Sequence, residues 1–385
     1  MTDFDDGPDR LADLLVEAGA LTDPAWEAAV RAVPRHAFLP ETVWVRDDDP
    51  PWRSPYGPDT PEWRDAAYAD YALVTQVDDG ESLGSDGRGM YPTSSASQPS
   101  LVVRMLQALN VTGGETALEI GTATGYNCAL LCRRLGDKAV TSVEVDAALA
   151  QQAREKLSAA GYEPRLVVSD GAVPVEGGPF DRILATVAAK SIPAAWITQL
   201  APDGMLVTPW GSDHAGHWLV RLTADGTGAA HGRILDEAPF MWLRSQRSHF
   251  GTWRDHVDVD APMQAGRTKL DPRAALGADG SGRAIVIGTL VPDLYQRVIR
   301  EGDEFTVWVY DAAGSWAAAD YVPGASEWVQ SRYGPRDIWA EIEAAYAVWE
   351  SAGRPEGDRI GLTVTADEHR LWVDAPSRVI GEGLP

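Results

Sequence analysis

Residues 116–126 constrain the fold of this chain more than any other stretch, and they read Thr-Ala-Leu-Glu-Ile-Gly-Thr-Ala-Thr-Gly-Tyr. A short apolar strand runs directly into a turn that begins at Gly121 and ends at Gly125, and a helical pattern follows. Glycine has no Cβ, so it permits a tight turn and a close approach of a ligand to the backbone. The spacing E-x-G-x-x-x-G lacks the complete G-x-G-x-x-G of dinucleotide-binding folds and therefore does not predict NAD.

Acidic residues stand at the ends of the next two predicted strands. Glu144 closes the strand 139–145, and Asp170 with Gly171 follows the strand 165–169. An acidic residue at such a strand end is placed to hydrogen-bond ribose hydroxyls. Together with the glycine turn, these residues predict a site for S-adenosylmethionine. The predicted cofactor-binding residues are Glu119, Gly121, Thr122, Ala123, Gly125, Tyr126, Glu144, Asp170 and Gly171.

Strands and helices alternate through the middle of the chain. Alternation of this kind predicts parallel β-α-β units, and hence an α/β fold with a doubly wound, Rossmann-like sheet of the class I methyltransferase type. The expected strands are 116–120, 139–145, 165–169, 181–187 and 204–209, and the expected helices are 125–135, 147–160 and 192–200. Residues 216–223 and 231–243 predict a closing antiparallel pair.

The flanking parts of the chain differ in composition. Before the glycine turn we expect helices at 9–18, from 24 onward and at 99–109, with loops at 47–65 and 78–95. After residue 250 we expect an irregular entry, 254–282, strands at 284–290, 305–310, 316–321, 360–365 and 370–373, and a helix at 335–351 with a core-facing apolar stripe. The expected domains are a helical and loop region that packs on the core and lines the substrate groove (1–95), a methyltransferase core (96–249) and a smaller α+β extension that binds the peptide substrate (250–385).

The composition and net charge indicate which classes of binding partner and which compartment to expect. The 385 residues carry a formal charge of −24, which disfavours nucleic acid because the field repels phosphates. The two cysteines, Cys128 and Cys132, predict small buried side chains in a reducing compartment. No apolar run approaches the length of a membrane span, and the acidic start has no signal-peptide core, so we expect a cytoplasmic protein. The histidines His214 and His217 lack further ligands at suitable spacing, so no metal is expected.

A second constellation precedes the glycine turn. Residues Ala96-Ser97-Gln98-Pro99 open the helix 99–109, which leads into Leu-Glu-Ile-Gly-Thr-x-Thr-Gly-Tyr, and this order resembles the protein-L-isoaspartate O-methyltransferase family. Segments 33–40, 67–70 and 180–189 also fit, so the resemblance covers roughly 10–245. It implies that Ser97 contacts the substrate carboxylate, that Glu144 holds the ribose and that Asp170 lies near the adenine. Taken without the resemblance, Ser97 is also a suitable N-cap for the helix.

Two departures from the family pattern bear on the substrate. Ala96 stands where the family usually has a β-branched residue, and the chain continues for more than a hundred residues beyond position 250. The extension resembles family members that methylate an aspartate in ribosomally synthesised modified peptides, after which the ester cyclises to aspartimide. That acceptor is our first hypothesis. Repair of isoaspartyl residues in damaged proteins is the alternative, and a binding protein that keeps the cofactor fold without catalysis is a third.

Methyl transfer to a carboxylate requires positioning rather than a base. A carboxyl group of pKa near 4 is already ionised at pH 7, so no general base is required, and no metal is needed. After methyl transfer the cofactor leaves as S-adenosylhomocysteine. Ser97 would orient the carboxylate, with Thr93, Ser94 and Ser95 as helpers. A cation near the groove would attract the substrate carboxylate, and Arg244 and Arg247 are the favoured substrate contacts. The six candidate cations are Arg35, His36, Arg88, Arg104, Arg244 and Arg247. The tryptophans of the extension could either grip a peptide or form its core.

Overall fold

The computed structural model describes residues 6–46, 53–81, 85–248, 253–277 and 280–384, and it divides the chain into two compact units. Unit 1 comprises Met1–Val187, Thr198–Thr208 and Leu243–Ser245, and unit 2 comprises Ala188–Ile197, Pro209–Trp242 and Gln246–Pro385. Residues 209–242, which we assigned to the methyltransferase core, thus group with the C-terminal part of the chain. Each unit is described by itself below.

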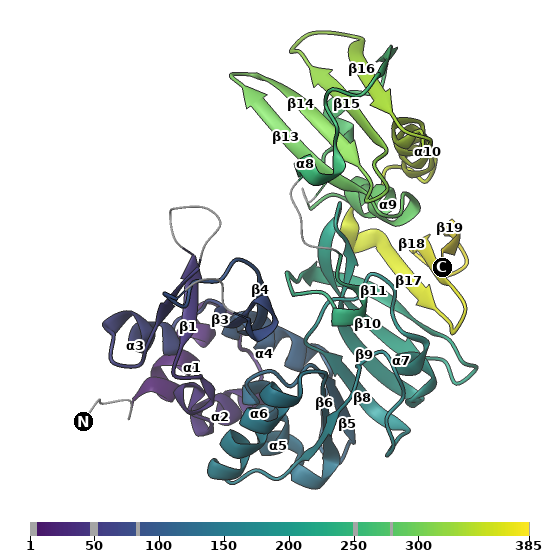
Figure 1. The fold of residues 1–385 in the computed structure, drawn as a ribbon. Coiled ribbons are helices and arrows are strands. Elements are labelled where there is room, and N and C mark those ends of the chain that lie inside the picture. The colour runs from purple at the N-terminus through teal and green to yellow at the C-terminus, as the bar shows by residue number, and fades with distance from the viewer. Residues whose placement is uncertain (1–5, 47–52, 82–84, 249–252, 278–279, 385) are drawn as a thin grey trace. The chain divides into compact units, whose positions relative to one another are not determined.

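The centre of unit 1 is a parallel sheet with the strand order β9-β8-β5-β6-β7 (Figure 1). The strands are β5 (Ala117–Ile120), β6 (Val140–Glu144), β7 (Arg165–Val168), β8 (Phe180–Ala185) and β9 (Leu200–Ser212), of which the last continues into unit 2. Helices α5 (Tyr126–Leu135) and α6 (Ala147–Ala159) connect the first three strands. The predicted Rossmann-like sheet is confirmed, and the cysteines Cys128 and Cys132 are buried in α5 with free thiols.

An antiparallel sheet and four helices precede this parallel sheet. The helices are α1 (Gly7–Glu17), α2 (Pro24–Ala32), α3 (Pro61–Ala67) and α4 (Pro99–Ala108). The sheet has the order β2-β1-β3-β4, with β1 (Val43–Arg46), β2 (Arg53–Tyr56), β3 (Leu73–Val77) and β4 (Pro92–Ala96). Our prediction of loops at 47–65 and 78–95 is therefore wrong where β2, α3 and β4 lie; residues 47–52 and 82–84 are outside the described ranges. Prolines and aspartates suggested loops, but Thr60 caps α3 and Pro61 begins it.

Unit 2 contains two antiparallel sheets. One has the order β19-β18-β17-β11-β10, with β10 (Gly216–Ala224), β11 (Ala230–Glu237), β17 (Ile360–Val364), β18 (His369–Val373) and β19 (Val379–Leu384). The other has the order β12-β16-β15-β14-β13, with β12 (Gln264–Thr268), β13 (Tyr295–Glu301), β14 (Glu304–Tyr310), β15 (Trp316–Tyr321) and β16 (Trp328–Tyr333). Its helices are α7 (Ala194–Thr198), α8 (Trp253–His256), α9 (Gly282–Leu290) and α10 (Ile338–Ser351).

Two predictions for the C-terminal part are wrong. Residues 284–290 form helix α9 rather than a strand, because Ser281 caps the helix by accepting a hydrogen bond from the backbone of Ala284 at 3.2 Å. A short apolar run does not by itself distinguish a buried strand from a buried helix. The stretch 254–282, which we expected to be irregular, contains strand β12; residues 278–279 lie outside the described ranges. Strands β13 and β16 were not predicted.

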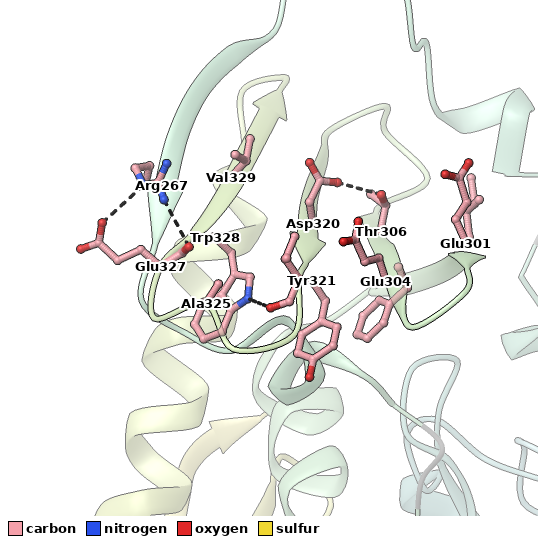
Figure 2. A pocket seen from close by; sticks show the side chains of 13 residues that line it. Arg267, Glu301, Glu304, Thr306, Asp320, Tyr321, Ala325, Glu327, Trp328 and Val329 are labelled. Carbon is pink, nitrogen blue, oxygen red and sulfur yellow. Dashed lines mark hydrogen bonds and ion pairs between the residues drawn. The ribbon is translucent and has the colours of Figure 1, made fainter.

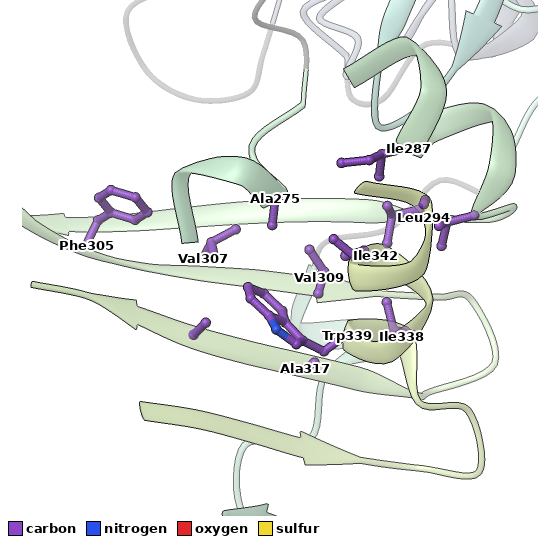
Figure 3. Close-up of a cluster of buried hydrophobic side chains, with 13 residues drawn as sticks. Ala275, Ile287, Leu294, Phe305, Val307, Val309, Ala317, Ile338, Trp339 and Ile342 are labelled. Atoms are coloured by element: carbon purple, nitrogen blue, oxygen red, sulfur yellow. The ribbon is translucent and has the colours of Figure 1, made fainter. Parts of the chain in front are cut away.

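Helix α10 covers one face of the five-stranded sheet (Figure 3). Its residues Ile338, Trp339 and Ile342 pack on Val307 and Val309 of β14. The apolar stripe of this helix was predicted to be core, and that prediction is confirmed. The tryptophans of the extension are also core rather than surface, with Trp308 half-buried and four others buried, namely Trp316, Trp328, Trp339 and Trp372.

Candidate functional site

The glycine turn lies at the carboxyl end of β5, as the sequence predicts. Gly121 and Gly125 have φ angles of +97° and +89°, in the region that glycine favours. The backbone N–H groups of Gly121 and Thr122 both donate to the carbonyl of Val143, at 2.8 and 3.2 Å, which ties the turn to β6. The turn is therefore held open at the edge where parallel sheets bind nucleotides.

Glu144 lies beside this turn, at the end of β6. One of its carboxylate oxygens accepts a hydrogen bond from the N–H of Ala123 at 2.9 Å, and the other accepts one from the N–H of Asp146 at 3.1 Å. The side chain is buried, but both oxygens retain further lone pairs. This orientation suits an acceptor for two vicinal hydroxyl groups.

Glu119 occupies a different environment from Glu144. It is fully buried, and its oxygens accept hydrogen bonds from Asn127 and from Ser142, both at 2.5 Å. Ser142 also bonds the hydroxyl of Thr122 at 2.6 Å, so Thr122 likewise faces this buried cluster. Burial raises the pKa of Glu119 to about 7, against the opposing hydrogen bonds from Ser142 and Asn127. These contacts support the turn from beneath, and a direct contact between Glu119 and a cofactor stays a prediction.

Three other predicted cofactor residues surround the same edge of the sheet. Asp170 accepts a hydrogen bond from the N–H of Ala172 at 2.9 Å. A Cβ on Gly171 would lie 2.5 Å from the Cγ2 atom of Ile120, so only glycine fits there. Tyr126 is buried at the start of α5. The fit of these residues to an S-adenosyl group therefore rests on the close packing at Gly121 and Gly171 and on the acidic side chains of Glu144 and Asp170 at the ends of neighbouring strands.

The serine segment forms strand β4 and the residues that follow it. The Ser97 side chain is half-buried, and no hydrogen-bond partner for its hydroxyl occurs among the described residues. Ser97 is not the N-cap of α4; that position is Gln98, and the N–H of Ser100 donates instead to the carboxylate of Asp70 at 2.8 Å. The Ser97 hydroxyl thus remains available to a substrate. Ala96 is buried, so it cannot line an open groove directly.

The proposed helpers of Ser97 are engaged within the sheet. Ser94 is buried and accepts a hydrogen bond from Thr75 at 3.3 Å. Thr93 donates to the side-chain carbonyl of Gln76 at 2.9 Å. Ser95 is half-buried on β4, paired with Val74. Their roles in substrate binding stay predictions, whereas their observed contacts position the strand that carries Ser97.

Arg35 organises the serine segment from the buried side. The residue is fully buried, and its Nη atoms donate to six backbone carbonyls at 3.2–3.3 Å, among them those of Ala96 and Ser97. Burial lowers the pKa of Arg35 to about 10, so the guanidinium stays charged at neutral pH. Arg35 is therefore a positioning residue rather than a substrate contact, which the sequence did not reveal.

Arg244 closes a ring of polar contacts between the serine strand and the end of β6. Its Nη2 lies 3.3 Å from Asp79 and 3.6 Å from Asp146. Asp146 also accepts a hydrogen bond from Gln76 at 3.0 Å, and the N–H of Asp79 donates to the hydroxyl of Thr93 at 3.1 Å. Together with the Thr93–Gln76 bond, these contacts form a closed ring, which we call the Arg244 ring (Arg244, Asp146, Gln76, Thr93 and Asp79).

The electrostatics of the ring favour its ionised form. Burial of Asp146 opposes ionisation, but the hydrogen bonds from Gln76 and two backbone N–H groups, together with Arg244, hold its pKa below the usual range. The ring residues other than Arg244 and Thr93 were missed, although Asp146 stands only two residues after Glu144. Arg247 belongs to unit 2, so its predicted role beside Arg244 stays untested.

Two other kinds of feature do not occur in the described part of the chain. Within these residues, no group of three or more His, Cys, Asp and Glu side chains could hold a metal ion. Among the described helices, none combines the length and the apolar composition that a membrane crossing needs.

Comparison with known families gives a consistent result. The sequence profile of the family described as protein-L-isoaspartate(D-aspartate) O-methyltransferase matches residues 56–247. The chain is 34% identical over 244 residues to protein-L-isoaspartate O-methyltransferase 1 of Rhodopseudomonas palustris, which covers 63% of this chain and 84% of that protein. It is 31% identical over 247 residues to protein-L-isoaspartate O-methyltransferase 2 of Archaeoglobus fulgidus, covering 63% of this chain and 95% of the relative.

A solved structure extends the likeness to the fold of the whole chain. A protein-L-isoaspartate O-methyltransferase superposes with a TM-score of 0.53 and 21% identity, covering 96% of this chain and all of that one. This likeness concerns the fold alone.

Proposed function

Because this chain belongs to the protein-L-isoaspartate O-methyltransferase family, we propose that it is a cytoplasmic enzyme that esterifies an isoaspartyl carboxylate in a peptide or protein. The class of reaction follows from the family: the chain is an S-adenosylmethionine-dependent carboxyl methyltransferase. The choice of acceptor is the proposal. It rests on the names of the relatives, which match this chain over 84% and 95% of their own length.

The structural observation that supports carboxyl methyl transfer at this site is the Arg244 ring. The ring joins β4, which leads to the free hydroxyl of Ser97, to the segment just after Glu144. The ring thereby links the sheet whose strand β4 leads to Ser97 with the segment that follows Glu144 at the end of β6. Methyl transfer needs this arrangement, because the attacking oxygen and the methyl carbon must be brought to about 3 Å of one another.

The residues of the chain have a limited task in this chemistry. S-adenosylmethionine, when bound, supplies a methyl group on a positively charged sulfur. The carboxylate oxygen forms a bond to that carbon as the carbon–sulfur bond breaks, so no proton moves and no general base is required. The Ser97 hydroxyl would donate a hydrogen bond to the other carboxylate oxygen and fix the line of attack. Arg35 donates to the backbone carbonyl of Ser97, and so holds this residue in place and adds no chemistry of its own.

A second candidate acceptor is an ordinary aspartate in a ribosomally synthesised modified peptide. Methylation would be followed by attack of the next backbone nitrogen on the ester carbonyl, loss of methanol and formation of an aspartimide. The observation that favours this candidate is the extra five-stranded domain of unit 2, with one face covered by α10. The domain offers a surface for a peptide outside the methyltransferase sheet.

One experiment separates the candidates. The full-length chain is incubated with S-adenosylmethionine and either of two peptides that differ only in an isoaspartyl or an aspartyl residue, and intact masses are recorded. The proposal predicts the gain of one methylene by the isoaspartyl peptide alone. A methylene gain by the aspartyl peptide, followed by loss of methanol, would instead support the tailoring reaction.

The variant S97A tests the role of the Ser97 hydroxyl, and S97T is its matched control. We expect S97A to lower kcat/KM by at least about tenfold while S-adenosylhomocysteine still binds, because one charge-assisted hydrogen bond is lost. The S97T variant keeps the hydroxyl and should retain more activity. Binding of the cofactor without methyl transfer to either peptide would support the third hypothesis, a protein that keeps the fold without catalysis.

A further inference from the structure

The five-stranded sheet of unit 2 leaves part of one face uncovered. Helix α10 packs on the opposite face, through Val307 and Val309 of β14. On the near face, Trp253 and Val257 cover only the end of the sheet that contains Trp316. A hollow of about 440 Å³ lies at the remaining end of the sheet; Ile299, Asp320 and Val329 of the near face line it, together with Phe305 and Tyr321 of the α10 face. The sheet therefore presents a surface that no described element of the chain covers.

Strand pairing aligns one residue from each strand across this surface. Ile299 pairs with Thr306, and Arg267 pairs with Val329 at the other side of the sheet. Asp320 pairs with Thr306, and it directly follows Ala319, which pairs with Gln330 beside Val329. Figure 2 shows Thr306, Asp320, Val329 and Arg267 on the same side of the strands. Ile299 and Val329 are 41% and 47% exposed, so the row combines apolar side chains with a carboxylate.

Carboxylates outnumber cations on this face, which also carries Arg267 and the exposed Arg297. Glu301 and Glu304 pair directly with one another in the next row, and Asp320 lies in the first. All three are exposed, and no cation within ion-pair distance of them occurs among the described residues. The cation Arg267 is already paired with Glu327, at 3.3 Å. We call this surface, with the apolar Ile299 and Val329 and the carboxylates Glu301, Glu304 and Asp320, the acidic sheet face.

We propose that the acidic sheet face binds an extended segment of the methyl-acceptor peptide in which lysine or arginine flanks an apolar side chain. The apolar side chain would cover Ile299 and Val329, and the cations would meet the three unpaired carboxylates. Five strands about 4.8 Å apart span roughly 19 Å, which matches about six residues of extended chain. The inference rests on the proposed function, since it assigns a substrate class to the same enzyme.

Binding to the full-length chain tests the inference without any methyl transfer. The probes are two dye-labelled decapeptides that differ only in a central Lys-Leu-Lys or Glu-Leu-Glu, and fluorescence anisotropy gives their dissociation constants. The test variant is E301Q/E304Q/D320N. The control variant is E356Q/D358N/D367N, which removes three exposed carboxyls from the same unit and changes the net charge equally.

The expected result is tighter binding of the Lys-Leu-Lys peptide and a loss of about tenfold in the test variant alone. Each exposed charge pair contributes a factor of roughly two, and the contribution falls as salt rises. Equal affinities of the two peptides, or equal effects of the test and control variants, would overturn the inference. A third peptide with Lys-Gly-Lys should bind more weakly than Lys-Leu-Lys; if it binds equally, the apolar part of the inference fails.

Kinetics then separate this inference from the proposed function. An isoaspartyl peptide extended by Lys-Leu-Lys should show a lower KM than one extended by Glu-Leu-Glu, with kcat unchanged, and E301Q/E304Q/D320N should abolish the difference. If the wild-type chain methylates neither peptide but binds Lys-Leu-Lys through the acidic sheet face, the proposed function fails and the binding surface stands. Methylation with equal KM values would leave the function intact and remove the surface.

Discussion

The substitution R35K tests the claim that a buried guanidinium positions the serine segment. Arg35 donates through Nη1 to the carbonyls of Ala66, Ala67 and Ala69, and through Nη2 to those of Tyr71, Ala96 and Ser97. Lysine keeps the positive charge but has one nitrogen, which can serve only one of these two groups of carbonyls. The substitution therefore isolates the forked geometry of the guanidinium from its charge.

The magnitude of the effect follows from the hydrogen bonds that lysine cannot form. Three of the six hydrogen bonds disappear, each with a net contribution of about 1 kcal/mol, so unfolding of unit 1 should become easier by about 3 kcal/mol. If the lysine bonds Ala66, Ala67 and Ala69, the carbonyl of Ser97 loses its partner. The segment around Ser97 should then move more freely, and kcat/KM should fall together with stability.

Hydrogen exchange followed by mass spectrometry measures this effect locally, which matters because two compact units need not unfold together. Protection should fall in fragments covering residues 94–100 and stay unchanged in fragments covering 305–320 of unit 2. The matched control is R31K, since Arg31 bears exposed ion pairs to Asp9, Asp13 and Glu27. If R35K behaves like R31K, the argument that Arg35 positions the serine segment is refuted.

Three further predictions concern the cofactor edge and the Arg244 ring. Burial raises the pKa of Glu119 from 4.5 to about 7, so protonated Glu119 contributes stability that is complete below pH 4.5 and is lost as the pH rises through 7. The free energy of unfolding should therefore fall by up to about 1.4 kcal/mol per pH unit between these values. Urea unfolding from pH 4.5 to 7.5 measures this dependence, which E119Q should flatten. The substitution G171A places a Cβ 2.5 Å from Ile120 and should weaken S-adenosylhomocysteine binding in calorimetry, with a loss of about 1–3 kcal/mol in stability. R244A should raise the KM of isoaspartyl peptides more than it lowers kcat, unlike the control R154A; equal losses on neutral and acidic peptides would contradict this.

The parallel sheet could be predicted from the sequence because its signals are local. The strand, the glycine turn and the helix at 117–135 are contiguous, and the positive φ angles of Gly121 and Gly125 are what the two glycines suggested. Glu144 was found for the same reason, since it ends a buried strand. The family resemblance then supplied the predicted role of Ser97, which stays a prediction.

The supporting contacts could not be predicted because they join distant parts of the chain. Gln76 and Asp146 are 70 residues apart, and Arg35 and Ser97 are 62 apart. No periodic pattern marks such pairs, and a buried arginine among backbone carbonyls resembles any surface arginine in sequence. Helix α9 was missed for a different reason: its apolar residues are nearly continuous, so that neither the helical nor the strand period stands out.

The charge of the protein has a consequence for its substrates in both units. Arg244 lies 3.3 Å from Asp79 and 3.6 Å from Asp146, so one cation faces two carboxylates and the Arg244 ring carries a net negative charge. The acidic sheet face of unit 2 is negative as well, through Glu301, Glu304 and Asp320. An acidic peptide would therefore be repelled by both surfaces, whereas a peptide in which cations surround the reactive residue would be attracted to both. We therefore expect an isoaspartyl peptide with basic flanking residues to be a better acceptor than the same peptide with acidic flanking residues.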